Sequence, residues 1–387
     1  MTLLQLSRTF LLEKDAIHTA SEIANQPVLW KQTAEKLFNA SAGIGDFLRE
    51  AFSETNNIIL TGAGTSAFIG LSLQGCFFTA TGKLTRAVAT TDIVSHPRHY
   101  FSEQDIPLVI SFARSGNSPE SIAALEQADS FSKKCFHLII TCSEEGALAK
   151  YHSKNPLLVF VLPEDANDKS LAMTGSYSSM LLTGLLLAYL PQNDFCRHQL
   201  RLVCASAEKI LKEEIEKIRQ LAEKNFERVV FLGSGPLLGT ATEAALKLQE
   251  LTDGGIICKS DSYLGFRHGP KAIIDGTTLV VYFFNSNQYV CQYENDLLHA
   301  MANGQPAMYQ FGISERGTNS RQLDSQVAFN PDTDDITEDF LTVCSILPAQ
   351  LLAFFKSLHL GLAPDKPSVS GSISRVVEGV NIYPITQ

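Results

Sequence analysis

The sequence predicts an α/β protein with two tandem lobes, each built on a mostly parallel sheet flanked by helices. Its 387 residues exceed what one hydrophobic core usually serves. Short, uninterrupted apolar runs alternate with helical segments, a pattern typical of parallel strands covered on both faces. A strand, a Gly-x-Gly turn and a helix also occur twice, at Gly62/Gly64 and at Gly233/Gly235, with a constant offset of 171 residues. This repeat indicates a duplication.

The first lobe is expected over residues 51–205, after an N-terminal helical segment at residues 1–50 in which Gly and Pro are scarce. Its apolar runs end at short polar turns, as buried strands do. The expected strands are Asn57–Thr61, Pro107–Phe112, His137–Thr141 and Leu157–Leu162, and the expected helices are Ala67–Phe78, Glu120–Ser130 and Met180–Leu190.

A linker helix is expected over residues 206–226, because Glu208–Asn225 is charged and contains no Pro or Gly. The second lobe follows at residues 227–360, and a tail rich in Pro, Ser and Gly occupies residues 361–387. In this lobe we expect strands at Arg228–Leu232 and Thr278–Phe284 and helices at Leu237–Thr252 and Leu347–Leu360.

Composition excludes several classes of protein. The net charge of −10 argues against nucleic-acid binding and, less strongly, against anionic membrane surfaces. The N-terminus lacks an apolar run with a cleavage site, and the most membrane-like segment, Met180–Leu190, is too short to span a bilayer. The eight cysteines form no C-x-x-C pair, so we expect buried free thiols in a reducing cytoplasm.

The turn Gly62–Ala67 partly resembles the glycine fingerprint of dinucleotide-binding proteins. That fingerprint needs an acidic residue about twenty positions later to hold the ribose. Here the first acidic residue is Asp92, so a nucleotide cofactor is not expected.

Hydroxyl side chains instead characterise two consecutive strand ends. Thr65 and Ser66 follow the first strand, and Ser115 and Ser118 follow the next. Ligands of open α/β sheets bind at the carboxyl ends of the strands, where helix N-termini favour anions. One such loop is as typical of ordinary helix capping as of binding. Two together favour a phosphate cradle, to which Arg114 would add a bidentate contact.

The second lobe offers acid–base groups. Glu243 and Glu250 lie on nearly one face of an expected helix, with Lys247 between them; Glu243 and Lys247 are expected to form a surface ion pair. Glu250 lies at the helix end, where its negative charge is unfavourable against the macrodipole, which suits a general base. His268, before Gly-Pro, reads as a positioned loop residue, although a simple hydrogen-bonded loop histidine is equally typical.

Four motifs in order make the pattern specific: Gly62-Ala-Gly-Thr-Ser66, Ser111-Phe-Ala-Arg-Ser-Gly-Asn-Ser118, Glu243-Ala-Ala-Leu-Lys-Leu-Gln-Glu250 and Arg267-His-Gly-Pro270. With them the chain resembles a double sugar-isomerase (SIS) protein. It is similar over nearly all its length to the isomerase part of glucosamine-6-phosphate synthase. It most resembles the AgaS branch, deaminating isomerases of galactosamine 6-phosphate.

The resemblance implies roles by position. Glu250 occupies the position of the family's proton-transferring carboxylate, and His268 occupies that of its ring-opening histidine. In relatives this histidine comes from a neighbouring subunit. A homodimer with sites at the subunit interface is therefore implied. Sugar-phosphate contacts are implied for Gly64, Thr65, Ser66, Arg114, Ser115, Asn117, Ser118 and Thr174.

Some features depart from the synthase. Ala113-Arg114 replaces a Ser-Gln pair, and the C-terminal lysine of the synthase has no clean counterpart, although Lys366 and Arg375 are candidates. The glutaminase domain is missing, which favours nitrogen release over incorporation. The scheme needs no cofactor, and no metal is expected, since the one close histidine pair, His96/His99, lacks further ligands.

The expected function is therefore conversion of galactosamine 6-phosphate to tagatose 6-phosphate and ammonia in amino sugar catabolism. Two alternatives stay open. One is a ketose–aldose isomerase of a neutral sugar phosphate such as tagatose 6-phosphate. The other is a sugar-phosphate sensor, which would not need Glu250 or His268.

Overall fold

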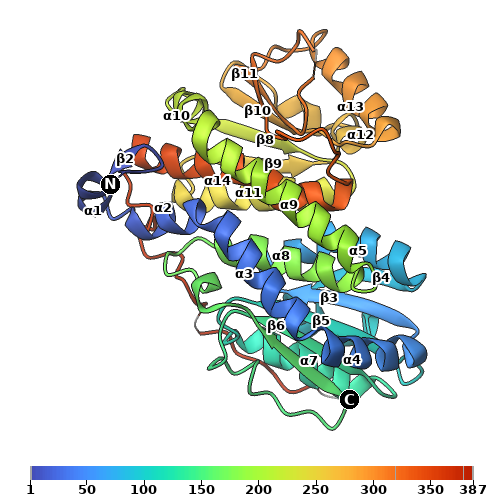
Figure 1. The fold of residues 1–387 in the computed structure, drawn as a ribbon. Coiled ribbons are helices and arrows are strands. Elements are labelled where there is room, and N and C mark those ends of the chain that lie inside the picture. The colour runs from blue at the N-terminus through green and yellow to red at the C-terminus, as the bar shows by residue number, and fades with distance from the viewer. Residues whose placement is uncertain (1, 319, 378, 386–387) are drawn as a thin grey trace. The chain divides into compact units, whose positions relative to one another are not determined.

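The computed structural model describes residues 2–318, 320–377 and 379–385. The chain divides into two compact units (Figure 1), neither of which is continuous along the sequence. Lobe 1 comprises Lys31–Asn167, Gly175–Asn193 and Ser374–Gln387, and lobe 2 comprises Met1–Trp30, Asp168–Thr174 and Asp194–Ile373.

Lobe 1 contains a five-stranded, fully parallel sheet with the strand order β4-β3-β5-β6-β7. Every residue of β3, β5 and β6 is buried, which explains why these strands read as uninterrupted apolar runs. The strands are β3 (Asn57–Gly62), β4 (Leu84–Ala89), β5 (Pro107–Ala113), β6 (Phe136–Thr141) and β7 (Leu157–Val161).

Helices flank this sheet, as the sequence predicted. Helix α8 is buried along its whole length and packs against α5. On another part of the sheet, α6 and α7 cover a cluster that includes Ile59, Val109 and Ile139. The helices are α3 (Gln26–Asn39), α4 (Ser41–Glu54), α5 (Thr65–Thr81), α6 (Thr90–Ser95), α7 (Pro119–Phe131) and α8 (Gly175–Ala188), with short 3-10 turns at Pro97–His99 and Glu164–Ala166.

Lobe 2 repeats the same topology. Its parallel strands lie in the order β9-β8-β10-β11-β12, so each strand has a counterpart in lobe 1. They are β8 (Arg228–Leu232), β9 (Ile257–Asp261), β10 (Thr278–Phe283), β11 (Tyr309–Ser314) and β12 (Ser325–Ala328).

The helices of lobe 2 come from both ends of the chain. An N-terminal hairpin, β1 (Thr2–Leu3) and β2 (Leu6–Ser7), precedes the first of them. They are α1 (Arg8–Glu13), α2 (Ile17–Ala24), α9 (Asn193–Lys209), α10 (Ile215–Ala222), α11 (Pro236–Leu251), α12 (Tyr263–Phe266), α13 (Gln288–Met301) and α14 (Glu338–His359), with a 3-10 turn at Pro270–Ile273.

The linker helix begins earlier than predicted and is not uniform. Helix α9 starts at Asn193, and a π-helical turn at Ile210–Glu214 separates it from α10. The amphipathic charge pattern continues through the turn, which is why the sequence reads as one helix.

The two glycine turns are nearly identical in conformation. Gly64 has φ 55° and ψ −127°, and Gly235 has φ 55° and ψ −126°. Both backbones lie where an L residue is strained. A Cβ on Gly62 would lie 2.6 Å from the Ser66 Cβ, and one on Gly233 would lie 2.2 Å from the Leu237 oxygen. The same close approach of strand to helix thus occurs at the offset that the sequence repeat indicated.

Among residues 2–318, 320–377 and 379–385, helix α14, and not Met180–Leu190, is the one helix long and apolar enough to cross a membrane. It is 94% buried within the protein, which is typical of a core helix. It also starts nine residues before the predicted Leu347, because Pro348 lies inside the helix instead of at its first turn.

All eight cysteines are free, as expected, and six are buried. Cys258 and Cys291 are partly exposed, which corrects the expectation of uniform burial. Cys258 lies on the edge strand β9 and Cys291 in the first turn of α13, where packing covers one side only.

Candidate active site

The first hydroxyl loop of lobe 1 joins β3 to α5. Thr65 and Ser66 form the first turn of α5 and are 3% and 5% exposed. Gly64 occupies the N-cap position, so no side chain covers the amide groups at the start of the helix. These features suit an anion at the helix N-terminus.

The second loop joins β5 to α7. Gly116 has φ 67°, which turns the chain sharply. The Ser115 hydroxyl accepts the Asn117 amide, at 3.3 Å. Ser118 occupies the N-cap position of α7 but makes no side-chain capping bond, because its hydroxyl donates to the Glu120 carboxylate in the first turn. A phosphate at Ser118 would therefore displace the Glu120 carboxylate, a negative group that already lies at this helix end.

Arg114 is 7% exposed and donates to the Arg375 carbonyl oxygen, at 2.6 Å. The Arg375 guanidinium in turn donates to Asn167 Oδ1, at 2.6 Å. Of the two C-terminal candidates, Arg375 thus lies beside the predicted phosphate loop, whereas Lys366 is exposed in lobe 2. The Arg375 contact is one that the sequence did not reveal.

Thr174 belongs to a segment held by lobe 2. Its amide donates to Asp168 Oδ2 at 2.7 Å, and its carbonyl accepts from Gln350 Nε2 at 3.4 Å. Gln26 donates to Gln350 Oε1, which fixes that amide. Burial and the neighbouring Asp168 raise the pKa of Glu22, which binds the same segment through Ser170, to about 7.

The α11 helix carries a buried charge cluster. The Lys247 Nζ lies 3.6 Å from Glu243 Oε1 and forms a short ion pair with Glu250 Oε2. The expected pair of Glu243 and Lys247 is present, but its side chains are 0% and 1% exposed. Its predicted surface location is therefore wrong, because this face of α11 packs against α14. The Glu250 side chain is 21% exposed. One carboxylate therefore reaches solvent while the ammonium that holds it does not.

His268 follows α12 in an exposed turn. Its amide donates to the Gly265 carbonyl at 3.0 Å, and Gly269 has φ 131°, a conformation suited to glycine. Arg267, His268 and Gly269 are all exposed. The imidazole is thus presented outward from lobe 2.

One group of potential metal ligands lies elsewhere, at the start of β6. Asp129 Oδ1 is 2.9 Å from His137 Nε2 and 3.0 Å from the Cys135 Sγ. Burial alone would raise the pKa of Asp129, but hydrogen bonds from His137, Cys135, Asn155 and Tyr151 hold it well below its usual range. Burial raises the pKa of the Cys135 thiol. Asp129, Cys135 and His137 Nε2 bind one another, whereas the buried His137 Nδ1 has no hydrogen-bond partner among the described residues. The group lies at the opposite end of the strands from the hydroxyl loops.

Comparisons with known proteins agree with this architecture. A family model for the SIS domain matches residues 51–190. The D-galactosamine-6-phosphate deaminase AgaS of Shewanella sp. (strain ANA-3) is 38% identical over 390 residues, which cover 99% of this chain and 96% of that protein.

Two solved structures are similar over the whole length. A candidate tagatose-6-phosphate ketose/aldose isomerase of Clostridium novyi NT has a TM-score of 0.95 and 39% identity, with 100% of both chains covered. The tagatose-6-phosphate ketose/aldose isomerase of Escherichia coli has a TM-score of 0.82 and 34% identity, with 95% of this chain and 97% of that one covered.

The paired sheets, the glycine turns and the SIS match define a protein with two phosphosugar-isomerase lobes. At this identity and coverage, the chain belongs to the AgaS family. The expected fold class and family are therefore confirmed. The individual site residues stay predictions.

Proposed function

We propose that this protein is an amino sugar phosphate deaminase/isomerase that converts galactosamine 6-phosphate and water to tagatose 6-phosphate and ammonia. The observation that carries the proposal is the half-buried Glu250 carboxylate, held by the buried Lys247 ammonium. A carboxylate so placed is fixed in position yet open to a substrate, as a general base must be.

Phosphate binding is assigned to the two hydroxyl loops of lobe 1. The hydroxyls of Thr65, Ser66, Ser115 and Ser118 and the N-termini of α5 and α7 would bind the phosphate. A phosphate held away from C1 and C2 positions the reacting carbons without taking part in the chemistry. The Glu120 carboxylate would move off Ser118 as the phosphate binds.

Proton transfer is assigned to Glu250. His268 moves a proton between the ring oxygen and the anomeric hydroxyl, which opens the sugar. Glu250 then removes the C2 proton and returns it to C1 through an enolamine. The resulting C2 imine adds water and expels ammonia. One carboxylate suffices, because C1 and C2 are adjacent on one face of the intermediate.

We further propose that the protein works in the cytoplasm as a homodimer. Eight free thiols without a disulfide suit a reducing compartment. His268 is exposed, so it could reach the active site of a second copy of the chain. If so, each reaction centre would need both subunits.

A second candidate function is isomerisation of tagatose 6-phosphate without loss of ammonia. Its specific support is the name of the two solved relatives, tagatose-6-phosphate ketose/aldose isomerase. This isomerisation would use Glu250 as the same base and would pass through an enediol instead of an enolamine.

The test is product analysis with the purified protein. Galactosamine 6-phosphate, glucosamine 6-phosphate and tagatose 6-phosphate are each incubated with it, and both ammonia and ketose phosphate are measured. Equal amounts of ammonia and tagatose 6-phosphate from galactosamine 6-phosphate are expected. Aldose formation from tagatose 6-phosphate, with no ammonia from either amino sugar, would instead establish the second candidate.

A further inference from the structure

Lobe 2 contains a polar cavity that includes none of the predicted active-site residues. Its volume is about 830 Å³, within the size range of small-molecule sites. It lies between the loop that follows β10 and the loop that follows β11, with α13 forming one wall. This is the carboxyl edge of the parallel sheet, where ligands of open α/β sheets bind.

The corresponding loops of lobe 1 leave no such room. There the Leu148 amide donates to the Gly116 carbonyl at 2.9 Å, and the Ala147 amide donates to Asn117 Oδ1 at 3.0 Å. A Cβ on Gly146 would lie 2.1 Å from the Ser115 oxygen, so the two loops are in direct contact. In lobe 1 these bonds close the space that lobe 2 keeps open.

In lobe 2 the two loops are anchored away from each other. Ser286 Oγ donates to the Ile336 carbonyl at 3.1 Å. Thr318 and Gln326 exchange two hydrogen bonds of 2.8 Å, which hold the loop after β11 against β12. The cavity is therefore built by specific contacts on both sides.

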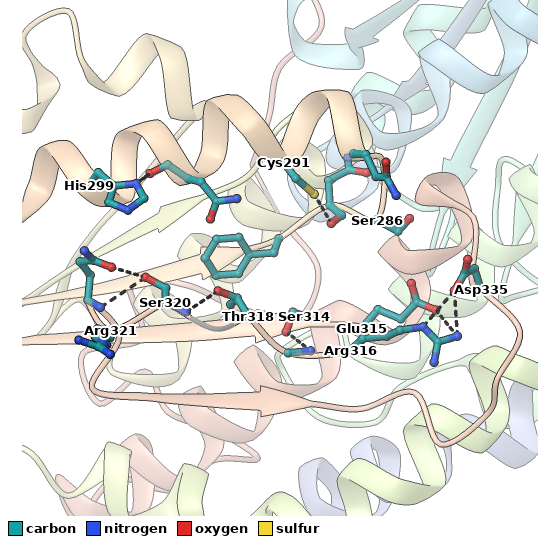
Figure 2. Close-up of a pocket in the computed structure, with 16 residues that line it drawn as sticks. Ser286, Cys291, His299, Ser314, Glu315, Arg316, Thr318, Ser320, Arg321 and Asp335 are labelled. Atoms are coloured by element: carbon teal, nitrogen blue, oxygen red, sulfur yellow. Dashed lines mark hydrogen bonds and ion pairs between the residues drawn. The ribbon is translucent and has the colours of Figure 1, made fainter.

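The charges in the cavity are unequally satisfied (Figure 2). At one end, Arg316 is bound by Asp335 Oδ1 and by the carbonyl oxygens of residues 332–334. At the other end, Arg321 lies beside Ser320, and its side chain has no hydrogen bond or ion pair within the described part of the chain. Arg321 is thus a cation available to an anion.

A buried donor at the cavity wall is also unsatisfied. Asn285 is 7% exposed, and its Oδ1 accepts the Asn287 amide at 2.8 Å. Its Nδ2 has no hydrogen-bond partner among the described residues. Buried polar groups without a partner are rare, and an absent ligand or water is one reason for them. The hydroxyls of Ser286, Ser314, Thr318 and Ser320 also line the cavity. Each already makes a hydrogen bond within the protein, and a hydroxyl can make further bonds to sugar hydroxyls.

We propose that lobe 2 carries a second binding site, separate from the active site, for a phosphorylated sugar whose phosphate binds Arg321 and whose hydroxyls bind the Ser, Thr and Asn side chains of this cavity. No reaction is assigned to it. The proposal rests on the cavity and its charges, so it does not depend on which reaction the protein catalyses.

The test is the binding stoichiometry of galactitol 6-phosphate, measured by equilibrium dialysis. This probe lacks a carbonyl and an amine, so neither proposed reaction consumes it. We expect two binding events per chain in the wild type. Arg321→Gln should weaken one of them by at least tenfold, because charge-assisted contacts contribute more than neutral ones. A Ser115→Ala/Ser118→Ala variant should weaken the other, and Arg8→Gln, an exposed arginine of the same lobe, should change neither.

A local readout separates this site from the active site. Cys291 lines the cavity, whereas Cys258, also partly exposed, does not. Galactitol 6-phosphate should slow thiol labelling of Cys291, but not of Cys258, in the wild type, and should lose this effect in Arg321→Gln. One binding event per chain, or unchanged binding and protection in Arg321→Gln, would overturn the proposal. Two events in a protein that releases no ammonia would leave it standing while the proposed reaction fails.

Discussion

Lys247, the buried lysine of α11, binds the carboxylate proposed as the general base. Lys247 contacts two carboxylates, of which Glu243 is fully buried and Glu250 is partly exposed. The Glu243–Lys247 pair is desolvated, so its Coulomb attraction is strong, but removing one partner leaves an uncompensated buried charge. The ion pair with Lys247 holds the Glu250 carboxylate in place, which suits the proton transfer proposed for it.

Lys247→Met tests that role. We expect the free energy of unfolding to fall by about 3 kcal/mol, because the buried Glu243 carboxylate and the partly exposed Glu250 carboxylate lose their common cation. We also expect kcat to fall more than tenfold with a smaller change in KM. The variant should still bind the substrate, but Glu250 would no longer be held in the orientation that proton transfer needs. Adding Glu243→Gln should restore much of the stability but little of the activity. Recovery of full activity in the double variant would contradict a positioning role.

The stability of the protein should depend on pH through the buried carboxyl group of Glu294. Burial raises the pKa of Glu294 from its ordinary 4.5 to about 7, although bonds from Asn285 and Ser234 oppose this. Because the folded state keeps the proton longer than the unfolded state, this stabilisation is complete below pH 4.5. It is lost as pH rises through 7.

Glu294→Gln should therefore flatten the decline of stability between pH 5 and 7 and raise stability at pH 8, by at most about 3 kcal/mol. Chemical denaturation at several pH values measures this. Part of the decline should persist, because the pKa of Glu22 is raised in the same direction. The exposed Glu223→Gln serves as control, and identical pH profiles for wild type and Glu294→Gln would refute the assignment.

The sequence predicted the helical spacing of Glu243, Lys247 and Glu250 but not the burial of their side chains. The three-residue and four-residue separations from Lys247 were visible, and they correctly placed all three side chains on one helix face. Burial of that face depends on packing against α14, which begins 87 residues later in the chain. The hydrogen bond from Arg114 to Arg375 was hidden for the same reason, since it joins residues 261 positions apart.

At the scale of elements, the two glycine turns form a matched pair. Gly64 and Gly235 share one backbone conformation, but only Gly64 lies beside the hydroxyl loops assigned to phosphate. Gly64→Ala and Gly235→Ala should each destabilise the protein by about 1–3 kcal/mol through strain. Only Gly64→Ala should weaken sugar-phosphate binding, as measured by equilibrium dialysis. Equal loss of binding in both variants would show that the turns do not differ in role.

The strands that the sequence predicted are mostly the buried ones. Central strands β3, β5, β6, β8 and β10 read as continuous apolar runs. Edge strands β4 and β9 were missed, because a strand with one exposed side contains polar residues such as Arg86 and Lys259. Two further strands of lobe 2 were missed: β11, an inner strand whose apolar run is interrupted by Gln310 and Gly312, and β12, which has only four residues.

At the scale of the whole molecule, the duplication explains both the symmetry and the specialisation. Strand order and the glycine turns are preserved in both lobes, while the loops differ. Lobe 1 keeps consecutive hydroxyl loops, and lobe 2 has Pro236 and Leu237 where lobe 1 has Thr65 and Ser66. The internal repeat and the parallel sheets could be predicted from the sequence. The discontinuous composition of the lobes could not, because it depends on where the chain ends pack.

In the proposed dimer, each active site would combine residues of both subunits. If Glu250 and His268 act from different subunits, mixing inactive Glu250→Gln and His268→Ala chains should restore activity. Random reassociation would give about a quarter of wild-type activity, from the one intact site of each mixed dimer. Ammonia release after co-refolding measures this. Activity no greater than that of the separate variants would place both groups in one subunit.

Glu250 is proposed to transfer the proton whose movement leads to ammonia release. The most direct test compares ammonia release from galactosamine 6-phosphate by the wild type, Glu250→Gln and Glu223→Gln, a glutamate at another helix end of the same lobe. We predict that Glu250→Gln lowers kcat by about 10²–10⁴-fold while sugar-phosphate binding is retained, and that Glu223→Gln is unchanged. Nearly full activity in Glu250→Gln would contradict the account.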